Sequence, residues 1–255
     1  CMEITAARFE QVEHCLPTQR GNVSLSNLQV LNAILYVAEH GCKWRGLPKR
    51  FGNWHTIYTR MNRWSKLGVL DRVFEQLQQS QVVRIRIEAV SLDSTIIKVH
   101  PDGTGALKKN GPQAIGKSRG GWTTKVHMVA ADARTAITFA LSPGQDGDGP
   151  MGRELLASLG APNRPLHLLM DSAYAGNETR QLALDLGYIP VVPPPRTRVE
   201  PWEYDREMYK RRNEVERLFR RLKGFRRIFS RFDKLDALFI GFISFSLIAD
   251  GLRLC

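Results

Sequence analysis

Apolar residues recur every three or four positions through the first third of the chain, which predicts helices from Ser26 to about Leu77. Glycines and a proline around positions 41–52 divide this stretch into short helices joined by turns. The pattern is typical of a helix-turn-helix-like unit, and we expect Arg60 and Arg63 of this unit to bind DNA phosphates. The alternative interpretation is a helical cap that packs on the next domain.

The pattern changes near Gln81, where β-branched residues predict a strand over 82–99. Two further strands are predicted over 122–131 and 135–141, with a turn between them. Three strands in succession favour an antiparallel meander. The segment 108–121 lies between the first two strands and is rich in glycine, lysine and arginine. This composition predicts a mobile basic loop.

We expect Lys117 and Arg119 of this loop to bind DNA phosphates. The second half of the chain alternates predicted helices and strands, in the order helix 151–159, strand 166–170, helix 177–186 and strand 189–192. A meander followed by this alternation is the order of a ribonuclease-H-like fold, an α/β mixed sheet flanked by helices. The pattern therefore predicts a small all-α, DNA-binding domain at 1–80 and a ribonuclease-H-like domain at 81–255.

The net charge of the chain is more informative about its partners than its overall composition is. Lysine and arginine number 37 against 25 aspartate and glutamate residues, a formal net charge of +12 that attracts polyanions such as nucleic acid. The most apolar stretch, 237–249, is far short of the roughly 20 residues of a membrane-spanning helix. It predicts a buried core helix and no membrane partner. The acidic N-terminal segment does not resemble a signal peptide, so we expect a cytoplasmic location.

Two aspartates fall where a metal site is expected. Asp93 interrupts a run suited to burial, and a buried carboxylate is costly unless a metal ion or another partner compensates it. The alternative partners are backbone N–H groups or an arginine. Asp171 directly follows the predicted strand 166–170, and ligands gather at the carboxyl ends of strands in α/β sheets. The simpler alternative is that Asp171 caps the next helix.

A predicted helix from about Glu203 to Phe225 supplies a third carboxylate. At about 100° per residue, one narrow stripe beside its apolar face contains Tyr209, Arg212, Glu216 and Lys223. Glu214 points away from this stripe. The alternative is that Glu216 only forms an ion pair with Arg212 or Arg220 on a solvated face.

The stripe reads Tyr-x2-Arg-x3-Glu-x6-Lys, and four further segments precede it in the chain. These are Cys-Lys-Trp-Arg-Gly-Leu-Pro at 42–48, Leu-Asp-Ser-Thr at 92–95, Gln-Ala-Ile-Gly-Lys-Ser-Arg-Gly-Gly at 113–121 and Asp-Ser-Ala-Tyr-Ala-Gly at 171–176. In these motifs and their order the chain resembles the bacterial insertion-sequence DDE transposases of the YREK-signature group. Each motif alone is weak, but their combination is specific and covers nearly the whole chain.

The resemblance implies a ribonuclease-H-like core that cleaves DNA at an element's terminal inverted repeats and joins the 3′-hydroxyl ends to target DNA. It assigns Arg212 and Lys223 to phosphates near the scissile bond and Tyr209 to the DNA backbone. It also implies dependence on divalent metal and assembly on double-stranded DNA. We expect a homodimer on DNA, because two element ends have to be held together.

The chemistry is an in-line attack on a phosphodiester. Two metal ions suit this reaction, because one activates the attacking oxygen and the other stabilises the leaving oxygen. Asp93, Asp171 and Glu216 are the predicted catalytic residues and metal ligands. Carboxylate oxygens select hard ions, so Mg²⁺ is the expected cofactor and Mn²⁺ a substitute.

Two alternative functions remain open. A ribonuclease-H-like nuclease or resolvase would cut DNA without joining it, and a strand-transfer assay separates these activities. A non-enzymatic DNA-binding regulator would keep the basic surface without catalysis. The presence of all three carboxylates together with the Arg/Lys pair disfavours the regulator.

Overall fold

The computed structural model describes residues 3–21, 23–82, 87–105 and 111–252. By internal contacts the chain divides into two compact units. The first, here called the helical unit, comprises Cys1–Ser80, Ile97–Gln113 and Arg221–Cys255. The second, here called the sheet unit, comprises Gln81–Ile96 and Ala114–Arg220. The division into domains at 1–80 and 81–255 stays a prediction.

The N-terminal region is helical, as its apolar spacing predicts. Its helices are α1 (Ala6–Glu13), α2 (Asn27–His40), α3 (Trp54–Lys66) and α4 (Val69–Val82), with the short 3-10 helices η1 (Trp44–Gly46) and η2 (Lys49–Phe51). A capping box formed by Ser26 and Gln29 begins α2. The helix ends at Gly41, whose φ of 65° lies in the left-handed region that glycine adopts most easily.

The end of the chain adds α9 (Arg226–Phe229) and α10 (Asp236–Gly251) to the helical unit. Most of α10 is buried, which agrees with the core helix predicted over 237–249. Its Gly241 lies so close to α3 that a Cβ atom there would be 2.1 Å from the Ser65 Oγ atom. Among the described residues, no helix combines the length and the apolar character that crossing a membrane requires.

The described strands form a mixed sheet. Its strands are β1 (Ala89–Val99), β2 (Gly116–Ser118), β3 (Gly121–Ala130), β4 (Ala136–Pro143), β5 (Leu166–Met170), β6 (Tyr188–Val191) and β7 (Ser230–Arg231). The order is β2-β3-β1-β5-β6, while β4 pairs with β3 and β7 with β1. The pairs β2/β3 and β3/β4 are antiparallel, and the pairs β1/β5 and β5/β6 are parallel. The predicted α/β mixed sheet is therefore confirmed.

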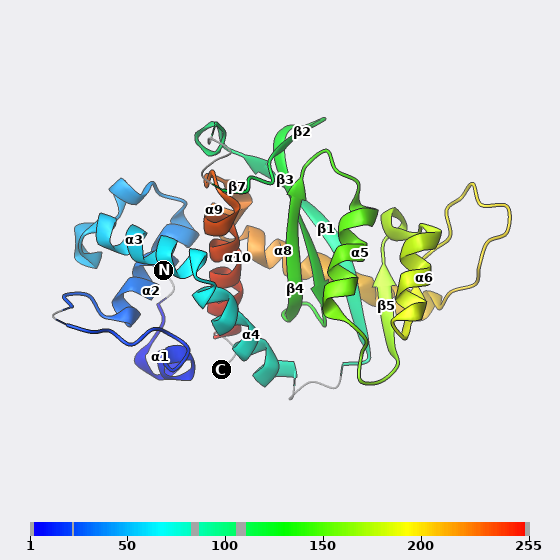
Figure 1. Ribbon diagram of the computed structural model, residues 1–255, viewed down its shortest axis with the longest axis horizontal. Coiled ribbons are helices and arrows are strands. Elements are labelled where there is room, and N and C mark those ends of the chain that lie inside the picture. Colours follow the sequence, from blue (N-terminus) through cyan, green and yellow to red (C-terminus); the bar gives the residue numbers. More distant parts are fainter. Residues whose placement is uncertain (1–2, 22, 83–86, 106–110, 253–255) are drawn as a thin grey trace. The chain divides into compact units, whose positions relative to one another are not determined.

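Helices cover both faces of this sheet. In the sheet unit, α5 (Asp148–Leu159) and α6 (Asn177–Asp185) lie against one face, as Figure 1 shows. That face buries Val90, Leu92, Leu168 and Met170 in a core with residues of α5. Ala89, Leu169 and Val191 point to the other face, where they contact Tyr204, Met208 and Tyr209. Because side chains alternate along a strand, Asp93 shares the second face with Ala89.

Two predictions of strands and loops are wrong in part. The basic loop predicted over 108–121 contains strand β2, whose Lys117 lies opposite Trp122 in an antiparallel pair. The turn uses Gly121 at a φ of 96°, so local turn chemistry outweighs the glycine-rich composition. The strand predicted from 82 begins only at Ala89, because α4 continues through Val82. Residues 83–86 and 106–110 of these two predictions lie outside the described residues.

The long helix predicted from about Glu203 to Phe225 is also interrupted. It consists of α7 (Arg206–Tyr209), the 3-10 helix η6 (Lys210–Arg212) and α8 (Asn213–Lys223). The helical segment begins only at Arg206, because the Asp205 side chain accepts a hydrogen bond from the Met208 N–H and caps it.

Candidate active site

Asp93 and Asp171 come from neighbouring parallel strands at matching positions. Leu92 of β1 pairs with Met170 of β5; Asp93 follows Leu92 within β1, and Asp171 directly follows the end of β5. Adjacent strands lie about 4.8 Å apart, so the register brings both carboxylate-bearing residues to the same point of the sheet. The charge of Asp171 contributes to raising the pKa of Asp93, as expected for two nearby carboxylates.

Glu216 is linked to Asp93 through Arg212. The Arg212 Nη1 atom donates to Asp93 Oδ2 at 2.6 Å, and its Nη2 atom donates to Glu216 Oε1 at 2.9 Å. The guanidinium carbon also lies 5.7 Å from the centre of the Tyr209 ring. One arginine thus joins the carboxylate of β1 to that of α8.

Asp93 is buried, with 8% of its surface exposed. The pKa of Asp93 is raised to about 6, mainly by burial and to a lesser extent by the charges of Asp171 and Glu216, whereas the Ser94 N–H and Arg212 oppose the shift. An ionised Asp93 in this environment needs a positive partner. Arg212 supplies that charge here, with a side chain that is 16% exposed.

Each carboxylate also has a hydrogen-bond or ion-pair partner that requires no metal ion. Asp93 accepts from the Ser94 N–H at 2.7 Å in addition to its bond with Arg212. Asp171 Oδ1 accepts from the Ser172 N–H at 2.8 Å and caps the 3-10 helix η5 (Ser172–Tyr174). Glu216 pairs with Arg212, and the carboxylate side chain is 43% exposed.

The three carboxylates offer oxygen ligands, which hard divalent cations prefer. The Asp93 carboxylate is also buried, so its charge favours a positive partner. Across residues 3–21, 23–82, 87–105 and 111–252, however, no group of three or more His, Cys, Asp or Glu side chains is gathered closely enough to hold an ion. Arg212 occupies the space between Asp93 and Glu216 instead. The metal-binding role of the three carboxylates therefore stays a proposal.

The other predicted site residues lie in several places. Lys223 is the last residue of α8 and lines a pocket of the helical unit with His40, Gly41 and Arg226. It follows Glu216 by seven residues of the same helix, a rise of about 10 Å. Burial lowers the pKa of Lys223.

The four predicted phosphate-binding cations differ in their surroundings. Arg63 of α3 and Lys117 and Arg119 of the β2/β3 hairpin are exposed. Arg60 is half-buried, and its Nη1 atom donates to the Leu25 carbonyl at 3.0 Å. Arg60 therefore has a structural contact that its place in the sequence did not indicate.

A buried polar group beside the aspartates was not predicted from the sequence. The Tyr174 hydroxyl lies 3.2 Å from His127 Nδ1, and His127 Nε2 lies 2.8 Å from Ser142 Oγ. The available signal was a histidine within the predicted strand 122–131, flanked by the apolar residues Val126 and Met128.

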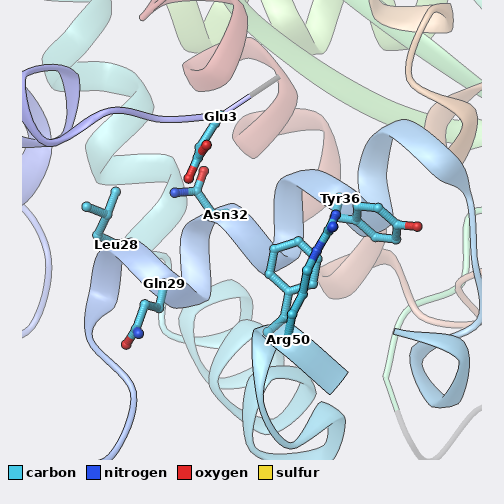
Figure 2. A pocket seen from close by; sticks show the side chains of 7 residues that line it. Glu3, Leu28, Gln29, Asn32, Tyr36 and Arg50 are labelled. Carbon is cyan, nitrogen blue, oxygen red and sulfur yellow. The ribbon is translucent and has the colours of Figure 1, made fainter. Parts of the chain in front are cut away.

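A pocket of the helical unit, drawn in Figure 2, lies among Glu3 and residues of α2 and η2 and contains none of the three carboxylates. The Arg50 guanidinium lies 5.7 Å from the centre of the Tyr36 ring on its wall. The Asn32 amide donates to the Ile4 carbonyl and accepts from the Ile4 N–H. Asn32 is thus engaged in holding the N-terminal segment, and we assign no function to this pocket.

The fold and the carboxylate positions define a ribonuclease-H-like protein. Residues 85–248 match the family described as "Transposase DDE domain", and residues 4–74 match "Putative transposase of IS4/5 family". The chain belongs to the DDE transposase family of bacterial insertion sequences. Family membership implies the use of a divalent metal ion.

One bacterial relative with a described function agrees with this assignment. The chain is 31% identical over 122 residues to "Putative transposase for insertion sequence element IS6501" of Brucella ovis, covering 48% of this chain and 92% of that protein. It is 34% identical over 86 residues to "Uncharacterized protein y4sN" of Sinorhizobium fredii, covering 34% of this chain and 66% of that protein. The second match thus spans slightly less than two thirds of the relative's length.

A solved structure shares the fold. The piggyBac transposase synaptic complex with hairpin DNA matches with a TM-score of 0.51, covering 97% of this chain and 72% of that chain. The two sequences are 11% identical, so the likeness concerns the fold alone.

Proposed function

We propose that this chain cleaves DNA at the ends of an insertion sequence and joins the freed 3′-hydroxyl ends to target DNA. Asp93, Asp171 and Glu216 are the proposed ligands of two divalent metal ions. The observation that supports the proposal is the pairing of the two strands that precede the aspartates, together with the two hydrogen bonds of Arg212. The two aspartates directly follow a paired position on neighbouring parallel strands, and Arg212 hydrogen-bonds both Asp93 and Glu216.

When bound, the metal ions supply Lewis-acid activation of the attacking oxygen and stabilisation of the leaving oxygen. Mg²⁺ is the proposed ion and Mn²⁺ its substitute, because both prefer carboxylate oxygens. The chain's own residues bind and orient the DNA. Arg212 is held between two carboxylates, and its fork of N–H donors matches the oxygens of a phosphate. We propose that Arg212 binds the scissile phosphate through these donors, while Asp93 and Glu216 would hold the metal.

The DNA-binding surface is proposed to include residues beyond this centre. Tyr209 contacts the DNA backbone next to Arg212, and Lys223 binds a phosphate further along α8. Arg60, Arg63, Lys117 and Arg119 are the remaining proposed phosphate contacts. The net charge of +12 supports a polyanionic partner. The partners are proposed to be the terminal inverted repeats and the target duplex.

Cleavage of a defined DNA end tests the proposal. The substrate is a duplex oligonucleotide carrying the inverted repeat that flanks the coding sequence, with MgCl₂ present. We expect Asp93→Asn, Asp171→Asn and Glu216→Gln each to lower the cleavage rate by more than about a hundredfold, because the metal site loses a ligand. Binding of the duplex, measured by fluorescence anisotropy in EDTA, should remain within about threefold of wild type.

Glu214→Gln is the matched control. Glu214 lies two residues before Glu216 on the same helix and pairs with Arg211, 3.6 Å away. Its variant should cut DNA at the wild-type rate. Equal activity of the Glu216→Gln and Glu214→Gln proteins would remove Glu216 from the active site and overturn the three-carboxylate proposal.

Two further measurements separate this proposal from its alternatives. A supercoiled target plasmid added to the cleaved end distinguishes a transposase, which joins the two, from a nuclease, which does not. Light scattering of the protein with end DNA tests the proposed homodimer. A monomer bound to one duplex would contradict the dimer while leaving the cleavage chemistry in place.

A further inference from the structure

Tyr174 belongs to a buried chain of hydrogen bonds in the sheet unit. Its hydroxyl is bonded to His127 of β3 and interacts with the Ser94 side chain of β1. His127 continues the chain to Ser142 of β4. Tyr174 is 1% exposed and His127 is fully buried. Polar groups at this depth are costly unless paired, so the bonded arrangement is strongly favoured over any in which Tyr174 swings away.

The same tyrosine is tied to both aspartates through their immediate neighbours. Its backbone N–H donates to the Asp171 carbonyl at 2.9 Å. Its hydroxyl interacts with the side chain of Ser94, whose backbone N–H donates to Asp93 Oδ1 at 2.7 Å. A single rigid ring therefore spans from the end of β5 to the middle of β1, the two strands that carry the aspartates.

Close packing holds the ring in place. Gly152 of α5 lies over the ring, and a Cβ atom at this position would be 2.5 Å from Tyr174 Cε1 and 3.3 Å from Leu92 Cδ2. Glycine leaves the space that the ring fills. The ring is thus clamped between the helix and the sheet, and this clamp limits motion of the hydroxyl.

The hydrogen bonds have a consistent direction. Burial lowers the pKa of His127 to about 4, so at neutral pH one ring nitrogen donates and the other accepts. In the arrangement that satisfies every group, Ser94 donates to the Tyr174 oxygen, Tyr174 donates to His127 Nδ1, and His127 Nε2 donates to Ser142. Ser142 Oγ in turn donates to the Pro143 carbonyl at 3.5 Å. Both hydrogen-bonding roles of the Tyr174 hydroxyl are then in use.

We propose that Tyr174 is a positioning residue, which fixes the spacing of Asp93 and Asp171 so that both can bind the same metal. This inference rests on the proposed function, because it assigns the aspartates to a metal site. Tyr174 touches neither substrate nor metal in this account. It acts through the backbone carbonyl of Asp171 and through Ser94, the residue next to Asp93.

Tyr174→Phe tests the inference, because it removes one hydroxyl and keeps the ring. Tyr188→Phe is a matched control. Tyr188 lies in the same core cluster, is 4% exposed and donates to the Gly160 carbonyl at 3.1 Å. Each variant loses one buried hydroxyl, but only Tyr174 is linked to residues adjacent to the aspartates. Mn²⁺ affinity by electron paramagnetic resonance, DNA affinity, cleavage kinetics and melting temperature are measured for both proteins.

We expect Tyr174→Phe to weaken Mn²⁺ binding about tenfold and to lower kcat for cleavage about tenfold to a hundredfold, the usual range for residues that support metal ligands. KM for the DNA end should change less than about twofold, since no DNA contact is lost. Tyr188→Phe should leave Mn²⁺ affinity and kcat within about twofold of wild type. Both variants should lower the melting temperature by a similar few degrees.

Equal effects of the two variants on Mn²⁺ affinity would overturn the inference, because a general loss of stability would then explain both. If Tyr174→Phe does not fold, Ser94→Ala replaces it. This variant removes the donor to the Tyr174 oxygen and keeps the backbone bond to Asp93. It should weaken Mn²⁺ binding severalfold, and unchanged affinity would overturn the inference.

Failure of the proposed function has a different signature. A wild-type protein that binds Mn²⁺ but does not cut DNA would refute the proposed function, and the Mn²⁺ comparison would still decide the role of Tyr174. A wild-type protein that cuts DNA, with a Tyr174→Phe variant equal to it in Mn²⁺ affinity and kcat, would refute the positioning role alone. A wild-type protein without Mn²⁺ affinity would refute both.

Discussion

Lowering the pH is expected to destabilise the fold through His127. This side chain is fully buried, and burial lowers its pKa to about 4 from an ordinary value of 6.5. Among nearby charges, Asp148 and Asp146 oppose the shift and Lys125 adds to it. Because the folded-state pKa is depressed, His127 stays neutral in the folded protein while the unfolded chain takes up a proton. The stabilising contribution is complete above pH 6.5 and disappears as the pH falls through 4.

The magnitude follows from the difference between the two pKa values. About 2.5 pH units at 1.36 kcal/mol per unit give about 3 kcal/mol in full, of which about 2 kcal/mol is lost by pH 5. This is a large share of the 5–15 kcal/mol by which domains are typically stable. The same protonation removes the acceptor for the Tyr174 hydroxyl.

Urea unfolding in EDTA, compared between wild type and His127→Gln, measures this contribution. Glutamine is neutral at every pH and keeps one donor and one acceptor. The free energy of unfolding of wild type relative to the variant should fall by about 2 kcal/mol between pH 7.5 and pH 5. A difference that does not change with pH would show that His127 titrates near its ordinary value in the folded state, which would refute the reasoning from burial.

Three further predictions concern packing, metal and DNA. Gly241→Ala should lower the free energy of unfolding by about 1–3 kcal/mol, because the new methyl group overlaps Ser65, and adding Ser65→Gly should restore part of the loss in urea melts. A loss of stability in Gly241→Ala that Ser65→Gly does not restore would contradict the close contact of α10 with α3. Adding Mg²⁺ should raise the melting temperature of wild type and not of Asp171→Asn; equal shifts would place the ion elsewhere. Replacing both Lys117 and Arg119 with alanine should reduce the slope of log affinity against log salt by about 2, and an unchanged slope would remove the hairpin from the DNA interface.

Much of the candidate site could be predicted because its signals are local. A strand that ends at Asp171 and a helical stripe that includes Glu216 are periodic patterns over a few residues, and periodicity depends on backbone geometry alone. The alternation of helices and strands predicted the α/β class for the same reason. The hairpin at 116–121 was missed because backbone pairing with β3 decides its conformation, and side-chain composition does not reveal that pairing.

The sequence by itself determined the helices and strands and the charged residues that lie at their ends. Only the tertiary structure decided which groups meet. Arg212 bonds Asp93 across 119 residues of chain, and Tyr174 bonds His127 across 47. These contacts follow from strand order, parallel register and the space that Gly152 leaves, all of which depend on packing between distant segments. Local spacing contains no information about such packing, because each segment would have the same periodicity in another fold.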